Sequence, residues 1–412
     1  MNLLNKFKNR IKNKYIKASL SLLGFQYVFF TINLLGQILL IRELNPEVFG
    51  EFAVVLSIVT IINMIMSLSV SVSYIRQDYS PTLFSSAMFI QCINWFVIFL
   101  ITLLVCVFIN GSYNEHTVNF IIIMTAFKLF EYVRNVIHAD MERNLKFSKA
   151  AIIIGLSSSG SLLCALILAK SDYYIYALLA REVLLSITSF VLTLLLWNNK
   201  EKICCKLNFP EIKELIQFSF RSIFARASEA IFMKSPILIC EKLYGTTATG
   251  LFNQSIYLAL LMNNALSPFT QKVAFVYYSK NKGNINKASR ASEKINVFIS
   301  LLLMPVLLAI YFFAFDILNF LWGNEWVGAT PYLRNLIGFM LFFPIYHNIK
   351  SLLFGLGKQI SVGAMLFISF LVFIVGVWFI QSAEQIPLVL SFSMALAVCL
   401  LRFVRKIKYD HK

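Results

Sequence analysis

The sequence predicts an all-α integral membrane protein with twelve transmembrane helices, in two six-helix bundles related by a pseudo-twofold axis along the membrane normal. Its 412 residues are 58% hydrophobic and only 14% charged, whereas a soluble protein carries about 25% charged residues. Apolar runs of the length that crosses a bilayer recur along the whole chain. In addition, one short turn sequence occurs twice, and this repeat predicts that the chain consists of two similar halves.

The apolar runs define the predicted spans, because a helix needs about 20 apolar residues to cross the hydrocarbon core. The alternation typical of barrel strands is not visible. The twelve spans cover residues 18–41, 50–75, 84–109, 117–137, 148–169, 173–197, 213–240, 248–275, 295–321, 329–354, 359–380 and 386–403. They group into a basic leader (1–17), an N-terminal bundle (18–197), a cytoplasmic linker (198–212), a C-terminal bundle (213–403) and a basic tail (404–412).

Basic residues gather on one side of this topology. Counting alternate loops places 25 Lys and Arg residues on the side of the two termini and three on the other, namely Arg42, Lys170 and Lys242. Because cytoplasmic loops are rich in Lys and Arg, both termini are predicted to be cytoplasmic. This bias accounts for the net charge of +17 without nucleic acid as a partner. Trp322 and Trp326 are interpreted as residues of the membrane-interface belt.

The repeated turn reads LNPEVFGEF at residues 44–52 and YGTTATGLF at 244–252. The pairs that share the offset of 200 are Gly50/Gly250, Phe52/Phe252, Asn63/Asn263 and Ser67/Ser267. The first copy follows span 1 and the second follows span 7. An even number of spans separates them, so the two halves run in the same direction, as in a parallel repeat.

The residues of the turn predict its local structure. Asn45 is expected to cap the next helix and Pro46 to occupy its first position. Gly50 and Gly250 lack a side chain, which would let each helix pass close to a neighbour.

Polar residues form narrow stripes on the first two spans of each half, since their spacing places them on one face of a helix. They are Gln26, Asn33 and Gln37 in span 1, Asn63 in span 2, and Asn253, Tyr257, Asn264 and Gln271 in span 8. We interpret them as the lining of a water-filled, substrate-binding cavity between the halves. The alternative is interhelical hydrogen bonding in a dry bundle.

Span 7 carries Arg221, Arg226, Glu229 and Lys234. Each charge at the bilayer centre costs about 2.5–3.5 kcal/mol on insertion scales, so these side chains are not expected to face lipid. Arg226, with Lys234 and Arg221, is predicted to bind an anion. The alternatives are an Arg226–Glu229 ion pair, packing of Lys234 against the other bundle, and an Arg221 side chain that extends to the membrane surface.

Span 4 carries a second group of charges, in which Lys128 and Glu131 are spaced to pair at i, i+3. The alternative is that Glu131, like Glu229, couples transport to an ion. The chain has no GxSxG or HExxH motif, and its seven cysteines show no metal-binding spacing. A transporter without catalytic residues, metal or cofactor is therefore expected.

Three segments carry a family resemblance, and in order they cover nearly the whole chain. They are LNPEVFGEF after LLIRE, LYGTTATGLFNQSIYLALLMNNALSPF at 243–269, and LWGNEWVGATPYL at 321–333. They resemble the corresponding segments of bacterial polysaccharide-unit flippases of the O-antigen (Wzx) type. These proteins belong to the multidrug/oligosaccharidyl-lipid/polysaccharide exporter superfamily.

The resemblance implies alternating access by two bundles in the bacterial inner membrane, with a central cationic cavity lined by spans 1, 2, 7 and 8. The implied substrate is an undecaprenyl-pyrophosphate-linked oligosaccharide, such as an O-antigen unit, moved from the cytoplasmic to the periplasmic leaflet. Membrane lipid, a polysaccharide polymerase and a chain-length regulator are the other implied partners. The family has no short motif for its cationic residues. The anion-binding role of Arg226 and Lys234 is therefore predicted from their position and chemistry alone.

Two other functions are compatible with parts of the sequence. A multidrug or cation exporter of the same superfamily would need an acidic cavity. Spans 7 and 8 instead carry four basic residues, Arg221, Arg226, Lys234 and Lys272, against Glu229. A membrane polysaccharide polymerase or ligase would need a long, charged outer loop, and the predicted outer loops are short.

Overall fold

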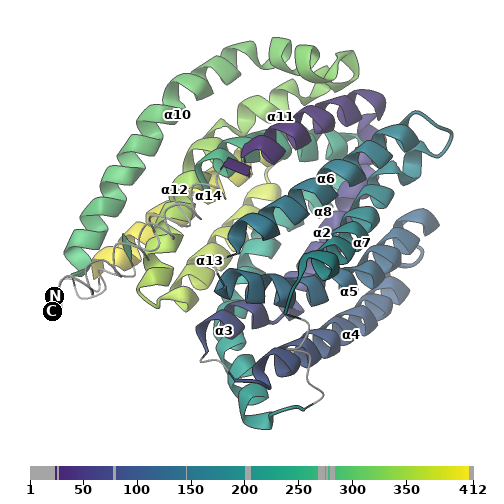
Figure 1. The fold of residues 1–412 in the computed structure, drawn as a ribbon. Coiled ribbons are helices and arrows are strands. Elements are labelled where there is room, and N and C mark those ends of the chain that lie inside the picture. Colours follow the sequence, from purple (N-terminus) through teal and green to yellow (C-terminus); the bar gives the residue numbers. More distant parts are fainter. Residues whose placement is uncertain are drawn as a thin grey trace. The chain divides into compact units, whose positions relative to one another are not determined.

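The computed structural model describes residues 24–25, 27–77, 80–144, 146–199, 206–267, 274, 277–278 and 284–407 (Figure 1). These residues are almost entirely helical, which confirms the predicted all-α class. After a first helix at 27–43, the helices are α2 (Pro46–Met66), α3 (Val70–Arg76), α4 (Leu83–Ile109), α5 (Glu115–Arg143), α6 (Phe147–Ala169), α7 (Ala177–Leu196), α8 (Phe209–Ser267), α10 (Ile285–Trp322), α11 (Thr330–Asn335), α12 (Ile337–Gly355), α13 (Gln359–Val377) and α14 (Ile386–Ile407). Short 3-10 turns η1 (Tyr174–Tyr176), η4 (Asn324–Ala329) and η5 (Ala383–Gln385) precede α7, α11 and α14.

Eight helical segments in the described part of the chain are long and apolar enough to cross a membrane. They coincide with α2, α4, α6, α7 with η1, α10, α12, α13, and α14 with η5. The first helix, α5 and the two halves of α8 occupy the remaining predicted spans. Both α5 and α8 carry several charged side chains, which lowers their apolar character. The helices are thus consistent with the twelve predicted spans.

The second predicted span, 50–75, is interrupted at residues 67–69. A break at membrane depth exposes backbone groups that need hydrogen-bond partners. Asn94 of α4 supplies them, since its Oδ1 accepts from the Leu68 N–H at 2.9 Å and its Nδ2 donates to the Met66 carbonyl at 3.0 Å. The two hydrogen bonds of Asn94 therefore stabilise the interruption. Ser67 and Ser71 lie after the end of α2, the helix that carries Asn63.

Two long helices contain internal breaks. In α8 the backbone of Gly245 adopts φ 83°, ψ 178°, a left-handed conformation that glycine tolerates. This single residue separates the predicted spans 7 and 8, and the helix resumes at Thr246. The other long helix, α10, contains Pro305 and a non-helical Phe313, and Figure 1 shows it as a long, curved ribbon.

The contacts divide the chain into two compact units. The first unit comprises the described residues up to Leu44 and from Met66 to Phe220. The second comprises Asn45–Ile65 and the described residues from Arg221 onward. Thus α2, which lies inside the predicted N-terminal bundle at 18–197, packs with the helices of the second unit.

The first unit is held at one end by the fully buried carboxylate of Asp140. Its Oδ1 accepts from the Tyr74 hydroxyl at 3.0 Å. Its Oδ2 accepts from the Trp197 indole at 3.1 Å and from the Asn199 amide at 2.9 Å. These bonds tie α3 and the segment after α7 to α5. The Asn144 amide is a fourth donor, at 3.4 Å from Oδ1, and these donors together offset the cost of removing the carboxylate from water.

In the second unit, the fully buried amide of Asn348 holds neighbouring helices together. The Oδ1 of Asn348 on α12 accepts from the Tyr278 hydroxyl at 2.8 Å. Its Nδ2 donates to Asn296 Oδ1 at 2.8 Å and to the Ser292 carbonyl at 3.1 Å, both on α10. Every polar atom of this side chain therefore has a partner, as a dry interior requires.

We predict that Asp140→Ala destabilises the protein by roughly 2–5 kcal/mol, because the buried donors of Tyr74 and Trp197 and the half-buried amide of Asn199 lose their acceptor. The measurement is the apparent melting temperature of the purified protein in micelles. The matched control is Asp172→Ala, since Asp172 is exposed. Equal melting temperatures for the two variants would contradict the anchoring role of Asp140.

Candidate functional site

The charged half of α8 meets α12 inside the second unit. Glu229, half-buried on α8, forms an ion pair with the Nζ of Lys350 on α12. The Nε2 of His347, one turn earlier on α12, lies 3.9 Å from Glu229 Oε1. Among the described residues the partners of Glu229 thus come from another helix. The ion pair of Glu229 with Arg226, given above as an alternative, is not among the ion pairs of the described residues.

Aromatic rings surround the lysine of this pair. The Nζ of Lys350 lies 5.9 Å from the ring centroid of Tyr346 and 5.6 Å from that of Phe354. The side chains of Lys350 and Glu229 are each 20% exposed. At this burial a lone charge would be costly, so each ion needs the other. Lys350 was not predicted as a site residue, although a lysine within the apolar run 329–354 was a signal that could have identified it.

Lys234 and Arg226 are the described cations of this half of α8 that are half-buried. Lys234 has no carboxylate within 4.0 Å among the residues that the structure describes. The two lie eight residues apart, or about 12 Å along a helix axis. Arg221 lies in α8, but its side chain is outside the described part. Lys234 is therefore the clearest candidate for contact with an anion.

The polar residues predicted on α2 and on the second half of α8 differ in exposure. Asn63 is 9% exposed, and its Nδ2 donates to the Val59 carbonyl of its own helix at 2.7 Å. Asn253 and Tyr257 are half-buried, whereas Asn264 is exposed. Gln271, also predicted, lies outside the described residues, as does Lys272. Asn253, Tyr257 and Asn264 thus remain within reach of a solute.

In the first unit, the predicted stripe of the first helix packs against its neighbours. The Nδ2 of Asn33 donates to Ser158 Oγ on α6 at 2.9 Å. The Oε1 of Gln37, a residue only 4% exposed, accepts from Arg181 Nη1 on α7 at 2.5 Å. These are the interhelical hydrogen bonds of the alternative interpretation. Gln26 lies outside the described residues, and Arg181 is a partner that the sequence analysis missed.

The charge group on α5 is an ion-pair cluster. Lys128 Nζ lies 3.0 Å from Glu131 Oε2, which confirms the predicted i, i+3 pair. Arg134 Nη2 lies 3.8 Å from the other oxygen of Glu131, and its Nη1 donates to Ser189 Oγ on α7 at 2.6 Å. Glu131 thus has two cationic neighbours, and the cluster ties α5 to α7.

The two copies of the repeated turn contact each other in the second unit. A Cβ atom on Gly50 would lie 1.9 Å from the Thr246 carbonyl oxygen. A Cβ atom on Gly250 would lie 1.8 Å from the Pro46 carbonyl oxygen. The two contacts interchange under the offset of 200, so the crossing of α2 and α8 is symmetric. The predicted close approach at both glycines is confirmed, and Asn45 Oδ1 caps α2 by accepting from the Val48 N–H at 3.0 Å.

Trp326 packs against α2 beside this crossing, and Trp322 packs against Trp326. Neither lies in an interface belt. Trp326 is 1% exposed, with its ring centroid 5.4 Å from that of Phe49 on α2. Trp322 is 3% exposed and lies 5.8 Å from Trp326. The belt interpretation is wrong because both indoles are buried in protein contacts.

Sequence comparison gives the family. The model of the polysaccharide biosynthesis protein family matches residues 39–331, which is most of the chain. The chain belongs to this family. A curated relative, the capsular polysaccharide biosynthesis protein CapF of Staphylococcus aureus, is 24% identical over 314 residues, covering 74% of this chain and 76% of CapF.

Solved structures give the fold. A multidrug resistance MATE transporter of the MOP superfamily, in an inward-facing conformation, matches with a TM-score of 0.76 at 12% identity, covering 95% of this chain and 98% of that one. The lipid II flippase MurJ, in an inward closed conformation, matches with a TM-score of 0.71 at 14% identity, covering 94% and 87%. The described chain therefore shares the fold of these transporters, as the resemblance of the three segments implied.

We predict that Glu229→Gln and Lys350→Met each destabilise the second unit by about 3–5 kcal/mol, because each leaves a buried charge unpaired. The double variant should recover much of this loss, since no charge remains. Melting temperatures of all four proteins in micelles measure the coupling. The matched cycle is Glu43→Gln with Lys170→Met, a pair at 3.3 Å with side chains 38% and 65% exposed, which should couple by less than about 1 kcal/mol. Additive losses at Glu229 and Lys350 would contradict a shared ion pair.

We predict opposite effects for two glycine-to-alanine changes. Gly50→Ala places a methyl group against the Thr246 carbonyl and should cost about 1–3 kcal/mol. Gly160→Ala, in α6, meets no atom within 4 Å and should stabilise by up to about 1 kcal/mol through helix propensity. Thermal unfolding of both variants in micelles is the measurement, and stabilisation by Gly50→Ala would disprove the tight crossing.

Proposed function

We propose that this protein is a flippase that moves an undecaprenyl-pyrophosphate-linked oligosaccharide from the cytoplasmic to the periplasmic leaflet of a bacterial inner membrane. The observation that supports it is the occurrence, in one chain, of a polysaccharide-biosynthesis sequence family and a transporter fold. A membrane-bound polysaccharide precursor is a cargo that fits both the family and the fold. CapF, by its name, acts in capsular polysaccharide biosynthesis.

The headgroup of this substrate is a pyrophosphate that carries sugars. We assign the pyrophosphate to Lys234 and Arg226, with Arg221, because cations form strong charge-assisted hydrogen bonds with phosphate oxygens. Lys234 is half-buried and unpaired among the described residues, so a bound anion would compensate its charge. Lys350 already serves Glu229 and is not part of this assignment.

The sugars need hydrogen-bonding groups in place of water. Asn253 and Tyr257 offer such groups along the α8 face that also carries the exposed Asn264. The other polar residues of the proposed lining are Gln26, Asn33, Gln37, Asn63 and Gln271. For Asn33 and Gln37, lining would require exchange of the hydrogen bonds that they now make to α6 and α7.

The energy source that we propose is the membrane potential. Outward movement of one negative charge from a negative interior is favourable by about 2.3 kcal/mol per 100 mV. Glu229 and Glu131 are the carboxylates proposed for ion coupling, and each lies against cations, Lys350 and His347 for the first and Lys128 and Arg134 for the second. Protonation of either carboxylate would release a neighbouring cation.

The rival function is export of a cationic drug, since the fold is also that of multidrug MATE transporters. A cation binder needs an acidic side chain that is available to its ligand. Glu229 is the acidic residue near the middle of α8 that the sequence analysis selected, and Lys350 neutralises it. The charges of α8 therefore favour an anionic substrate.

The test is complementation of a deletion strain with the wild-type gene, Lys234→Ala, Arg226→Ala or the matched control Lys170→Ala, whose residue pairs with Glu43 on the surface. Lipid-linked oligosaccharide and surface polysaccharide are quantified at equal protein expression. We expect Lys234→Ala and Arg226→Ala to accumulate the lipid-linked unit and to lower surface polymer at least tenfold, because one lost charged hydrogen bond is worth about 1.5–3 kcal/mol.

Three outcomes would contradict the proposal in different ways. Unchanged polysaccharide with altered drug sensitivity in the deletion strain would indicate an exporter. Lipid-linked units that reach the periplasmic leaflet but stay unpolymerised would indicate a polymerase. A functional Lys234→Glu variant would remove the anion-binding role from Lys234 alone.

A further inference from the structure

A groove lies between the end of the first half of α8 and the end of α13, within the second unit. Its volume is about 450 Å³, and its lining is Ile239, Lys242, Leu243, Ile374, Val377 and Trp378. The volume falls in the range of about 300–1,000 Å³ that is typical of small-molecule sites. All its lining side chains but Lys242 are apolar or aromatic.

The polar and apolar parts of this groove are ordered along the helices. Lys242 and Leu243 lie just before the α8 break at Gly245, and Trp378 is the C-cap of α13. Helix ends that carry Trp and Lys are typical of the membrane–water interface. Ile239 and Ile374 lie about one turn deeper in α8 and α13. The groove thus has a charged end at the interface and an apolar end toward the hydrocarbon, which matches the polarity of a lipid.

The charge at the interfacial end is not satisfied by the protein. Lys242 is exposed and has no carboxylate within 4.0 Å in the described ranges. It is one of the three cations on the basic-poor side of the topology, where Lys and Arg are disfavoured. Lys170, on the same side, pairs with Glu43 at 3.3 Å. Lys242 is therefore left to attract an external anion.

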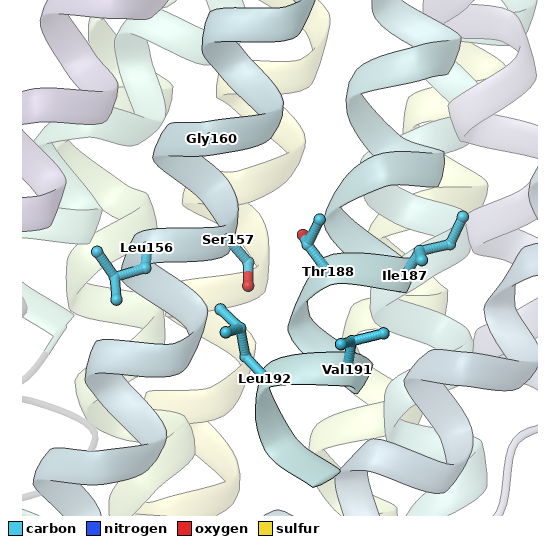
Figure 2. Close-up of a pocket in the computed structure, with 7 residues that line it drawn as sticks. All are labelled: Leu156, Ser157, Gly160, Ile187, Thr188, Val191 and Leu192. Atoms are coloured by element: carbon cyan, nitrogen blue, oxygen red, sulfur yellow. The ribbon is translucent and has the colours of Figure 1, made fainter. Parts of the chain in front are cut away.

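A second groove is apolar like the first but has no lysine or arginine in its lining. It lies between α6 and α7 in the first unit, with a volume of about 330 Å³ (Figure 2). Leu156, Ile187, Val191 and Leu192 line it, and Ser157 and Thr188 are its polar residues. An acyl chain fits such a surface, but no cation selects its headgroup. The α6–α7 groove therefore offers only a surface for an acyl chain, whereas the α8–α13 groove also offers a cation for a headgroup.

We propose that the groove between α8 and α13 is a binding site for one anionic phospholipid of the surrounding leaflet. An acyl chain lies along Ile239, Ile374 and Val377, and the phosphate headgroup meets the Lys242 ammonium. Trp378, which is 84% exposed, covers the glycerol level of the lipid, where aromatic rings are enriched. The site shares no residue with those assigned above to the substrate, and the inference does not rest on the proposed transport function.

The test is native mass spectrometry of the purified full-length protein after equilibration with equal amounts of phosphatidylglycerol and phosphatidylethanolamine of the same chain length. The variants are Lys242→Gln, the matched Lys170→Gln, and Ile374→Trp, which fills the groove. We expect wild type to retain phosphatidylglycerol in preference, and Lys242→Gln to lower this preference about fivefold, the factor expected for one basic residue at an anionic surface. Lys170→Gln should leave it unchanged, and Ile374→Trp should lower retention of both lipids.

Equal retention of the two lipids by wild type would overturn the proposal, because Lys242 would then only extend into water. An equal loss of preference in Lys242→Gln and Lys170→Gln would also overturn it, since a diffuse surface charge would explain the result. Size-exclusion profiles identical to wild type identify variants that have kept their fold. Retention of phosphatidylglycerol that persists in Ile374→Trp would place the lipid elsewhere.

Discussion

The buried polar groups of this structure are subject to one constraint, which is that neither the hydrocarbon core nor the packed interior supplies water as a hydrogen-bond partner. Glu229 and Lys350 satisfy each other across two helices, and Asn94 closes the gap in the second predicted span. Asp140 of α5 accepts from donors on α3 and on the segment after α7 in the first unit. Each of these groups fixes the position of a neighbouring helix, because its partner comes from another part of the chain. In a bundle whose contacts are otherwise apolar and interchangeable, such bonds specify the packing.

The repeated turn has a physical meaning that goes beyond descent from a duplicated half. Two helix starts can cross at the distance between Gly50 and Gly250 only if neither carries a Cβ atom. A symmetric contact imposes the same requirement on both copies, so the two glycines recur at the same offset. Phe49 and Trp326 then cover the crossing. Surrounding positions of the turn, such as Pro46 and Thr246, contribute backbone to the contact and are free to differ in side chain.

Long apolar runs and helix-capping signals made the fold predictable from the sequence, as did the repeat. Partners of buried charges were less predictable, because periodicity places Glu229 on a face of its helix but does not tell which helix that face meets. Lys350 lies 121 positions further along the chain, and only the packing brings it to Glu229. Trp326 was misassigned for the same reason, since a tryptophan near a span end is typical of an interface and also of a buried contact. The break after Met66 was missed because its remedy, Asn94, lies on another helix.

The membership of α2 in the second unit changes how the chain can be taken apart. Its covalent neighbours, Leu44 and α3, belong to the first unit, while its packing partners lie after Arg221. If the gene were split between the two predicted halves, the first fragment would carry α2 without its packing partners. The second fragment would lack α2. The two fragments could then reassemble only if α2 of the first packed into the second, as in a domain swap. Fusion of two separate six-helix bundles would therefore not by itself give this chain, because one helix encoded within the first half packs in the second unit.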